Sequence, residues 1–337
     1  MVTVHLLEVF SMLKRSLCSA VTLASIALST SSFADEKLVL YTSQPNSDAQ
    51  QTVDAFQAAY PDIEVEWVRD GTTRLMTRLR SELAAGVSNP DVLLIADSMT
   101  MTSLKQEGHL QPYLSPERDA YDEALYDPEG YFYGTKLITT GIVYNTGAEQ
   151  QPKRWEDLTG SEYEGLVTMP SPLYSGAALI HMAAIAENPA LGLEYYEALQ
   201  ANRTEAQGGN GGVFNAVAAG TKPYGIVVDF LPIREAAKGS PVAFVFPEEG
   251  VSAVTEPVAI MQEAENLDAA QKFVDFVLSQ EGQTLVSQQG YLPAHPDVTP
   301  PEGFPERSSI DLMPVDIEQA LEQEETLKQR FSDLFGG

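Results

Sequence analysis

Short apolar segments alternate with amphipathic segments along the chain, and this alternation constrains the fold more than any other feature. Residues 37–43 predict a buried strand, and residues 46–60 follow as a helix with apolar positions on one face. Residues 63–68 alternate like a strand, residues 70–83 predict a second helix, and residues 91–96 form a strand that is apolar on both faces. Burial on both faces is typical of parallel sheets. The order of the elements therefore predicts a doubly wound α/β fold.

The chain contains two segments that predict connections between separate α/β units. Residues 137–145 indicate a strand that leaves the first unit, and residues 254–260 indicate a strand that returns to it. Two such crossings imply a discontinuous first lobe, 35–140 with 257–337, and a continuous second lobe, 141–256. We predict that the two crossover strands form a hinge between these lobes.

The first residues carry the pattern of a secretory signal peptide. A basic pair leads into an apolar run over residues 16–28, and the small residues that follow end at Ala34. We predict that residues 1–34 are removed and that the mature protein is exported to the periplasm. Either Met1 or Met12 fits as the start of this leader.

Composition limits the kinds of partner and site. The single cysteine, Cys18, lies within the predicted leader, so we expect no disulfide and no cysteine metal site in the mature chain. A formal net charge of −28 opposes binding to nucleic acid and to anionic membranes. An anionic ligand would therefore need local compensation by backbone amides and arginines. We expect a monomer without a cofactor.

The sequence contains no arrangement that indicates catalysis. The four histidines, His5, His109, His181 and His295, are scattered, and no zinc-protease, hydrolase-elbow or phosphate-loop motif occurs. Hydrolysis requires a nucleophile with a base within reach, and no pair of residues suggests one. We predict a binding protein and keep a secreted phosphate-ester hydrolase as the alternative from another class.

Several short motifs occur in an order that is typical of one family. They are Tyr41-Thr42-Ser43, Pro90-Asp91-Val92, Ser175-Gly176-Ala177-Ala178, Asn210 before a helix, and residues 269–289 followed by Leu292-Pro293. By these motifs the chain resembles the type II periplasmic binding proteins, in their ferric-binding and organophosphate-binding branch, over nearly all of residues 37–300. The resemblance implies a two-lobed protein that closes on a small solute and then docks on the membrane permease of an ABC importer.

The resemblance also indicates where a ferric ion would be bound, and the expected ligands are missing there. The corresponding positions are Pro45, Ala96, Asp229 and Phe230, where the family's iron binders carry histidine, glutamate and two tyrosines. Ferric iron prefers phenolate, carboxylate and imidazole ligands. We therefore predict no metal site, and we keep ferric iron, polyamine, thiamine and sugar phosphate as alternative ligands.

The anion-binding half of that family's site is retained. Ser175, Gly176 and Ala177 precede an apolar helix, and Asn210 precedes another. A helix start exposes unpaired amides and carries a partial positive charge, which suits a phosphoryl group. An ordinary helix cap explains the same residues, but the resemblance implies that they bind phosphate.

A second helix start could bind the same anion from the first lobe. Thr72 and Thr73 supply hydroxyls, and Arg74 lies in the first turn, where its guanidinium could reach an anion. The alternative is that Arg74 is a solvated helix residue paired with a nearby acid.

Side chains at strand ends complete the candidate site. Thr42 and Ser43 lie at the carboxyl end of the first predicted strand, and Asp97 or Ser98 follows the third, at the edge where open α/β sheets bind ligands. Asp229 and Glu256 could attract an ammonium group or accept sugar hydroxyls, although Asp229 could equally cap a helix and Glu256 could serve the hinge. We therefore expect a small phosphorylated or phosphonate solute, with 2-aminoethylphosphonate as the best guess and hexose phosphates next.

Overall fold

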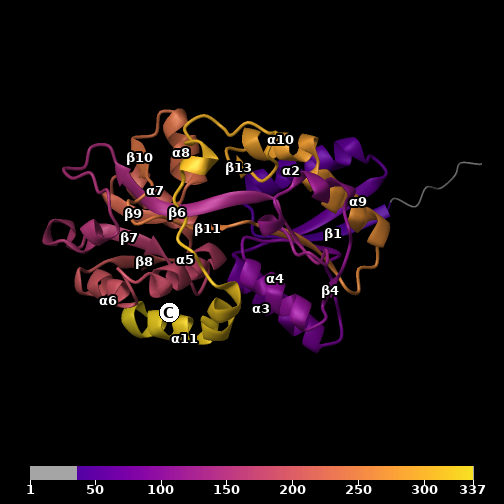
Figure 1. The fold of residues 1–337 in the computed structure, drawn as a ribbon, viewed down its shortest axis with the longest axis horizontal. Coiled ribbons are helices and arrows are strands. Elements are labelled where there is room, and N and C mark those ends of the chain that lie inside the picture. The colour runs from indigo at the N-terminus through magenta and orange to yellow at the C-terminus, as the bar shows by residue number, and fades with distance from the viewer. Residues whose placement is uncertain (1–35, 337) are drawn as a thin grey trace, which may run out of the picture. The chain divides into compact units, whose positions relative to one another are not determined.

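The computed structural model describes residues 36–336 of the chain, which fold around two β-sheets (Figure 1). The predicted signal peptide, residues 1–34, lies outside the described residues. Among residues 36–336, no helix is both long and apolar enough to cross a membrane.

The first sheet combines parallel and antiparallel strands. Its order is β2 (Ile63–Arg69), β1 (Glu36–Thr42), β3 (Val92–Leu94), β12 (Pro257–Met261) and β4 (Leu110–Gln111), and β5 (Tyr133–Gly134) also pairs with β12. Its helices are α2 (Asn46–Ala59), α3 (Thr72–Ala84), α4 (Ser98–Gln106), α9 (Leu267–Leu278) and α10 (Gln280–Gln288). β1 pairs in parallel with β3, as the burial of both predicted.

Alternating side chains of β1 pack into different cores. Leu38 and Leu40 join Phe56 of α2 and Phe273 of α9, whereas Tyr41 joins the apolar face of α3. Successive side chains of a strand point to opposite faces, so the sheet has a core on each side. Packing on both faces holds β1 and β3 in place, and with them the positions of the helix starts that follow these strands.

The second sheet is built around the long strand β6 (Lys136–Asn145). Its order is β10 (Val242–Val245), β6, β9 (Tyr224–Val228), β7 (Val167–Pro170) and β8 (Glu205–Gln207), and β11 (Ser252–Val254) and β13 (Leu292–Pro293) also pair with β6. Its helices are α5 (Gly176–Glu187), α6 (Glu194–Ala201), α7 (Asn210–Ala218) and α8 (Phe230–Ala237). Five 3₁₀ helices occur among the described residues, at Pro116–Ala120, Glu123–Leu125, Glu156–Thr159, Ser161–Tyr163 and Arg307–Ser309.

The last helix, α11 (Ile317–Phe335), packs against α4 as well as α5 and α6 (Figure 1). It buries Ala320, Leu327 and Phe331. These residues lie on one face of the helix, and the remaining face carries most of its acidic side chains. α11 therefore links a helix of the first sheet with two helices of the second.

The chain crosses between the sheets close to the predicted points. β5 in the first sheet leads directly into β6 in the second, and β11 leads back into β12. The return is not the single strand predicted for residues 254–260, because it breaks at Glu256, where φ is +39°. The α/β prediction is confirmed, whereas the exact lobe boundaries remain a prediction.

Candidate ligand-binding site

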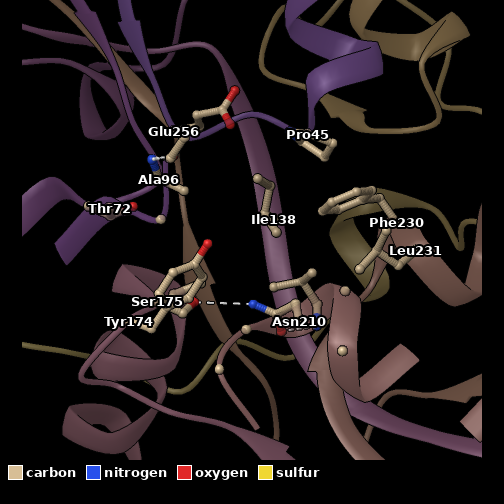
Figure 2. A pocket seen from close by; sticks show the side chains of 18 of the residues that line it. Pro45, Thr72, Ala96, Ile138, Tyr174, Ser175, Asn210, Phe230, Leu231 and Glu256 are labelled. Carbon is tan, nitrogen blue, oxygen red and sulfur yellow. Dashed lines mark hydrogen bonds between the residues drawn. The ribbon is translucent and has the colours of Figure 1, made fainter. Parts of the chain in front are cut away.

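A cavity of about 500 Å³ lies where the starts of several helices meet (Figure 2). Residues at the amino-terminal ends of α2, α3, α5, α7 and α8 line it. The first amides of a helix have no acceptor within the helix, and the helix dipole places partial positive charge there. The convergence of these ends favours an anion, even though the chain as a whole is acidic.

Ser175 and Asn210 form one wall of the cavity (Figure 2). Ser175 caps α5, and its Oγ accepts hydrogen bonds from the Ala178 amide, at 3.3 Å, and from Asn210 Nδ2, at 3.2 Å. Asn210 is held in turn because its Oδ1 accepts from the Val228 amide at 3.2 Å. Since Ser175 Oγ accepts both bonds, its own proton remains available to donate to a ligand.

Arg69 brings a positive charge to the cavity from the carboxyl end of β2. Its Nε donates to the carbonyl of Gln44 at 2.7 Å, which orients the guanidinium. Among the described residues that line the cavity, Arg69 is the only lysine or arginine, and the one acidic side chain there, Glu256, is paired with Lys136. The remaining N–H groups of Arg69 can therefore bind an anion. Sequence reasoning missed Arg69; the available signal was its position at a strand end, directly before the helix start of α3.

Glu256 supplies the carboxylate of the lining, and its charge is compensated by a lysine. Its Oε2 lies 2.5 Å from Lys136 Nζ and accepts from Gln44 Nε2 at 3.2 Å. Burial raises the pKa of Glu256, and the Lys136 ammonium opposes this shift. Lys136 also lies 4.1 Å from the ring centroid of Tyr291, a cation–π contact. The ion pair reduces the repulsion that Glu256 alone would exert on an anionic ligand.

The structure brings half of the predicted residues together at the cavity. The lining includes Ser43, Thr72, Ser175, Ala177, Asn210 and Glu256. Gly176 is not part of the lining; it packs against the segment between β3 and α4, since a Cβ at this position would be 2.8 Å from the carbonyl oxygen of Ala96. The residues predicted at the starts of α5 and α7 therefore share one cavity with Ser43, after the end of β1, and Thr72, at the start of α3.

Four other predicted residues lie away from the lining and have structural contacts. Thr42 is fully buried, and its Oγ1 accepts from the Gln44 amide. Asp97 is buried and caps α4 by accepting from the Thr100 amide. The remaining two contact the residue before Ser175: the Thr73 amide donates to the Tyr174 carbonyl, and the Arg74 guanidinium lies 5.1 Å from the Tyr174 ring centroid.

Asp229 is placed at the end of β9 as expected, but its carboxylate points into the protein. It accepts from the Thr139 amide at 2.9 Å, from Thr139 Oγ1 at 2.7 Å and from the Phe230 amide at 2.7 Å. Burial raises the pKa of Asp229 to about 7. The geometry therefore gives no support for a contact between Asp229 and the ligand, since the carboxylate caps α8 and binds β6 instead.

The positions that would hold iron in the resemblance are also visible in the structure. Pro45, Ala96 and Phe230 line the cavity, and none of these side chains can ligate a metal. Across residues 36–336, no three histidine, cysteine, aspartate or glutamate side chains are grouped closely enough to hold a metal ion.

Comparison with solved structures identifies the fold. AfuA from Actinobacillus pleuropneumoniae, solved with exogenous fructose-6-phosphate bound, matches with a TM-score of 0.82 at 23% identity, over 90% of this chain and 99% of that chain. The ferric binding protein from Campylobacter jejuni matches with a TM-score of 0.76 at 20% identity, over 88% and 99% of the two chains. The fold is thus that of the type II periplasmic binding proteins, as predicted.

Sequence comparison then identifies the family. The family described as bacterial extracellular solute-binding protein matches residues 88–316, and the chain belongs to it. Iron uptake protein A1 of Synechocystis sp. is 23% identical over 273 residues, which cover 76% of this chain and 75% of that protein. The chain is therefore a solute-binding protein of the class that serves ABC importers.

Proposed function

We propose that this protein captures a small phosphorylated or phosphonate solute in the periplasm and delivers it to an ABC permease. The solute binds in the cavity that Arg69 and the helix starts line, and closure of the two predicted lobes encloses it. The first compound to test is 2-aminoethylphosphonate, followed by hexose phosphates.

The observation that carries this proposal is the charge of the cavity lining. Arg69 presents its free N–H groups beside the starts of α3, α5 and α7, and Ser175 adds a hydroxyl donor. A phosphoryl or phosphonyl group offers several acceptor oxygens, and arginine and helix amides are the donors that proteins use for such groups. The one carboxylate of the lining, Glu256, is neutralised by Lys136.

The relatives support two kinds of ligand. AfuA was solved with fructose-6-phosphate, which is consistent with a phospho-ligand in this fold. Ferric-binding proteins share the fold as well, so ferric iron is the second candidate. A sugar phosphate or phosphonate would accept hydrogen bonds from the N–H and O–H groups of the cavity. Iron would instead need side-chain oxygen or nitrogen atoms that can bind it as ligands.

The side chains that could donate electron pairs to iron have other contacts. Glu256 is paired with Lys136, and the hydroxyl of Tyr291 donates to Asp48 at 2.5 Å. The hydroxyl of Tyr174 points toward Asp70, with a separation of 3.4 Å. Burial raises the pKa of Tyr291, so its phenolate form is disfavoured. These contacts favour an anionic ligand over a ferric ion.

A thermal-shift comparison tests the proposal. The purified protein is heated with 2-aminoethylphosphonate, glucose 6-phosphate, inorganic phosphate or ferric citrate, and with ethylamine and glucose as counterparts that lack the phosphorus group. A ligand that binds the native state raises the melting temperature by mass action. We expect a rise with the phosphorus compounds and none with their counterparts. Stabilisation by ferric citrate alone would overturn the proposal, and turnover of a chromogenic phosphate ester would indicate the hydrolase alternative.

A further inference from the structure

Tyr174 lies at the meeting point of three helix starts. It directly precedes Ser175, the cap of α5, and its ring packs against Gly71 and Gly209, which are the cap residues of α3 and α7. Tyr174, Gly71 and Gly209 all line the ligand cavity, and Figure 2 shows the Tyr174 side chain beside Ser175. α3 belongs to the first sheet, whereas α5 and α7 belong to the second.

The ring packs directly on the glycine backbones. A Cβ at position 71 would lie 2.5 to 2.8 Å from Cζ, Cε1 and Cε2 of Tyr174, and a Cβ at position 209 would lie 2.7 Å from Cε1 and 2.9 Å from Cδ1. Any side chain at either position would therefore force the ring to move. The ring occupies the space that the two missing side chains leave, and it brings the α3 start close to the α5 and α7 starts.

Further contacts join Tyr174 to the β2–α3 connection and to the first turn of α3. The Thr73 amide donates to the Tyr174 carbonyl at 3.4 Å, and the Tyr174 hydroxyl approaches Asp70 Oδ1 at 3.4 Å. The Arg74 guanidinium lies 5.1 Å from the ring centroid, within cation–π range. Each contact is weak alone, but all of them tie one residue of the second sheet to one segment of the first.

The helix starts themselves oppose this approach. Each start carries partial positive charge, so bringing the ends of α3, α5 and α7 together costs electrostatic energy unless an anion lies between them. Asp70 Oδ1, which accepts from the Gly71 amide at 2.7 Å, offsets part of this cost at the α3 start. A bound anion would offset more of it, and a contact that spans the gap would stabilise the approach further. Tyr174 provides the spanning contact because its ring is flat and apolar and its face attracts Arg74.

We infer that Tyr174 is the closing contact of the binding cavity, a positioning residue that holds the α3 start against the α5 and α7 starts once the solute is bound. This inference rests on the proposed function, because the bound anion offsets more of the repulsion between the helix starts. The Tyr174 ring packs on the backbones of Gly71 and Gly209, and it can do so because neither residue has a side chain.

The test measures the separation between α3 and α7. Spin labels are attached to cysteines introduced at Thr77 of α3 and Asn215 of α7, both exposed, in a full-length chain that also carries Cys18→Ser. Distances are recorded without added ligand and with inorganic phosphate. The variants are Tyr174→Ala, which removes the contact, Tyr174→Phe, which keeps the ring, and Gly71→Ala, which displaces it. Tyr60→Ala, a half-buried tyrosine at the far end of α2, is the control.

The inference predicts a short-distance population that grows with phosphate in the wild type, in Tyr174→Phe and in the Tyr60→Ala control. Tyr174→Ala and Gly71→Ala should both lose this population, although Gly71→Ala retains the tyrosine. Wild-type distances in both variants would overturn the inference. If phosphate leaves the wild-type distances unchanged, the proposed anion site fails. If phosphate shortens the distance in the wild type and equally in Tyr174→Ala and Gly71→Ala, the role of Tyr174 fails while the anion site stands.

Discussion

Replacing Arg69 by methionine is the sharpest perturbation of the proposed site. The change removes the only lysine or arginine charge on the described cavity lining and keeps a side chain of similar length. Hydrogen bonds to charged groups contribute about 1.5–3 kcal/mol, and each 1.4 kcal/mol is a factor of ten in affinity. We therefore expect binding of a phospho-ligand to weaken by roughly 10- to 150-fold.

The same variant should remain nearly as stable as the wild type without ligand. Among residues 36–336, the side chain of Arg69 makes one hydrogen bond, to the Gln44 carbonyl, whose loss costs about 1 kcal/mol. The ligand affinity of Arg69→Lys should lie between those of the wild type and Arg69→Met, because lysine keeps the charge but not the planar fork of donors. Titration calorimetry with 2-aminoethylphosphonate and glucose 6-phosphate measures the affinities, and chemical denaturation measures the stabilities.

Arg78→Met is the matched control for Arg69→Met. It removes the same charge from the solvent-facing side of α3, where Arg78 pairs with Glu82 at 2.8 Å. We expect unchanged affinity in this control. Equal losses in both variants would show that long-range charge, not a contact in the cavity, governs binding. Unaltered affinity in Arg69→Met would refute the assignment of Arg69 to the anion.

Three further predictions concern buried groups around the cavity. Burial raises the pKa of Asp229 from 3.8 to about 7, so its contribution to the free energy of unfolding is full below pH 4 and is lost as pH rises toward 7. Asp229→Asn should therefore make the free energy of unfolding less dependent on pH in denaturant titrations between pH 4 and 8. An unchanged pH dependence would contradict the raised pKa of Asp229. Lys136→Met leaves Glu256 buried and unpaired and should lower the free energy of unfolding by about 3–5 kcal/mol. Adding Glu256→Gln to Lys136→Met should restore most of the lost free energy of unfolding. No recovery in this double variant would show that Lys136 and Glu256 are not coupled. Gly176→Ala places a Cβ 2.8 Å from the Ala96 carbonyl oxygen and should weaken ligand binding in calorimetry, whereas wild-type affinity would show that the α5 start can shift freely.

The residues that sequence reasoning placed correctly are those fixed by the backbone. The resemblance implied Ser175 and Asn210 at two helix starts, the end of a buried strand indicated Ser43, and all three line the cavity. Strand and helix ends can be read from hydrophobic periodicity, because burial sets where each element begins and stops. This is why the α/β fold could be predicted, and why half of the predicted site residues lie on the cavity lining.

The predicted residues that do not line the cavity depend on side-chain direction and on contacts between distant segments. The sequence predicts Arg74 as the anion-binding arginine because it lies in a helix's first turn, but its guanidinium lies over Tyr174. Arg69, which no sequence pattern singled out, reaches the cavity from a strand end. Asp229 follows its strand as expected, yet Thr139, ninety residues away in sequence, supplies hydrogen bonds that draw its carboxylate inward. Sequence periodicity carries no information about such partners.

A crystal structure of the protein grown with 2-aminoethylphosphonate or glucose 6-phosphate would test the central claim most directly. The account predicts a phosphorus group in the cavity, with its oxygens accepting hydrogen bonds from Arg69, from Ser175 Oγ and from amides at the starts of α3, α5 and α7. A metal ion bound in that cavity, or a phosphorus group bound elsewhere on the protein with the cavity lining untouched, would contradict it.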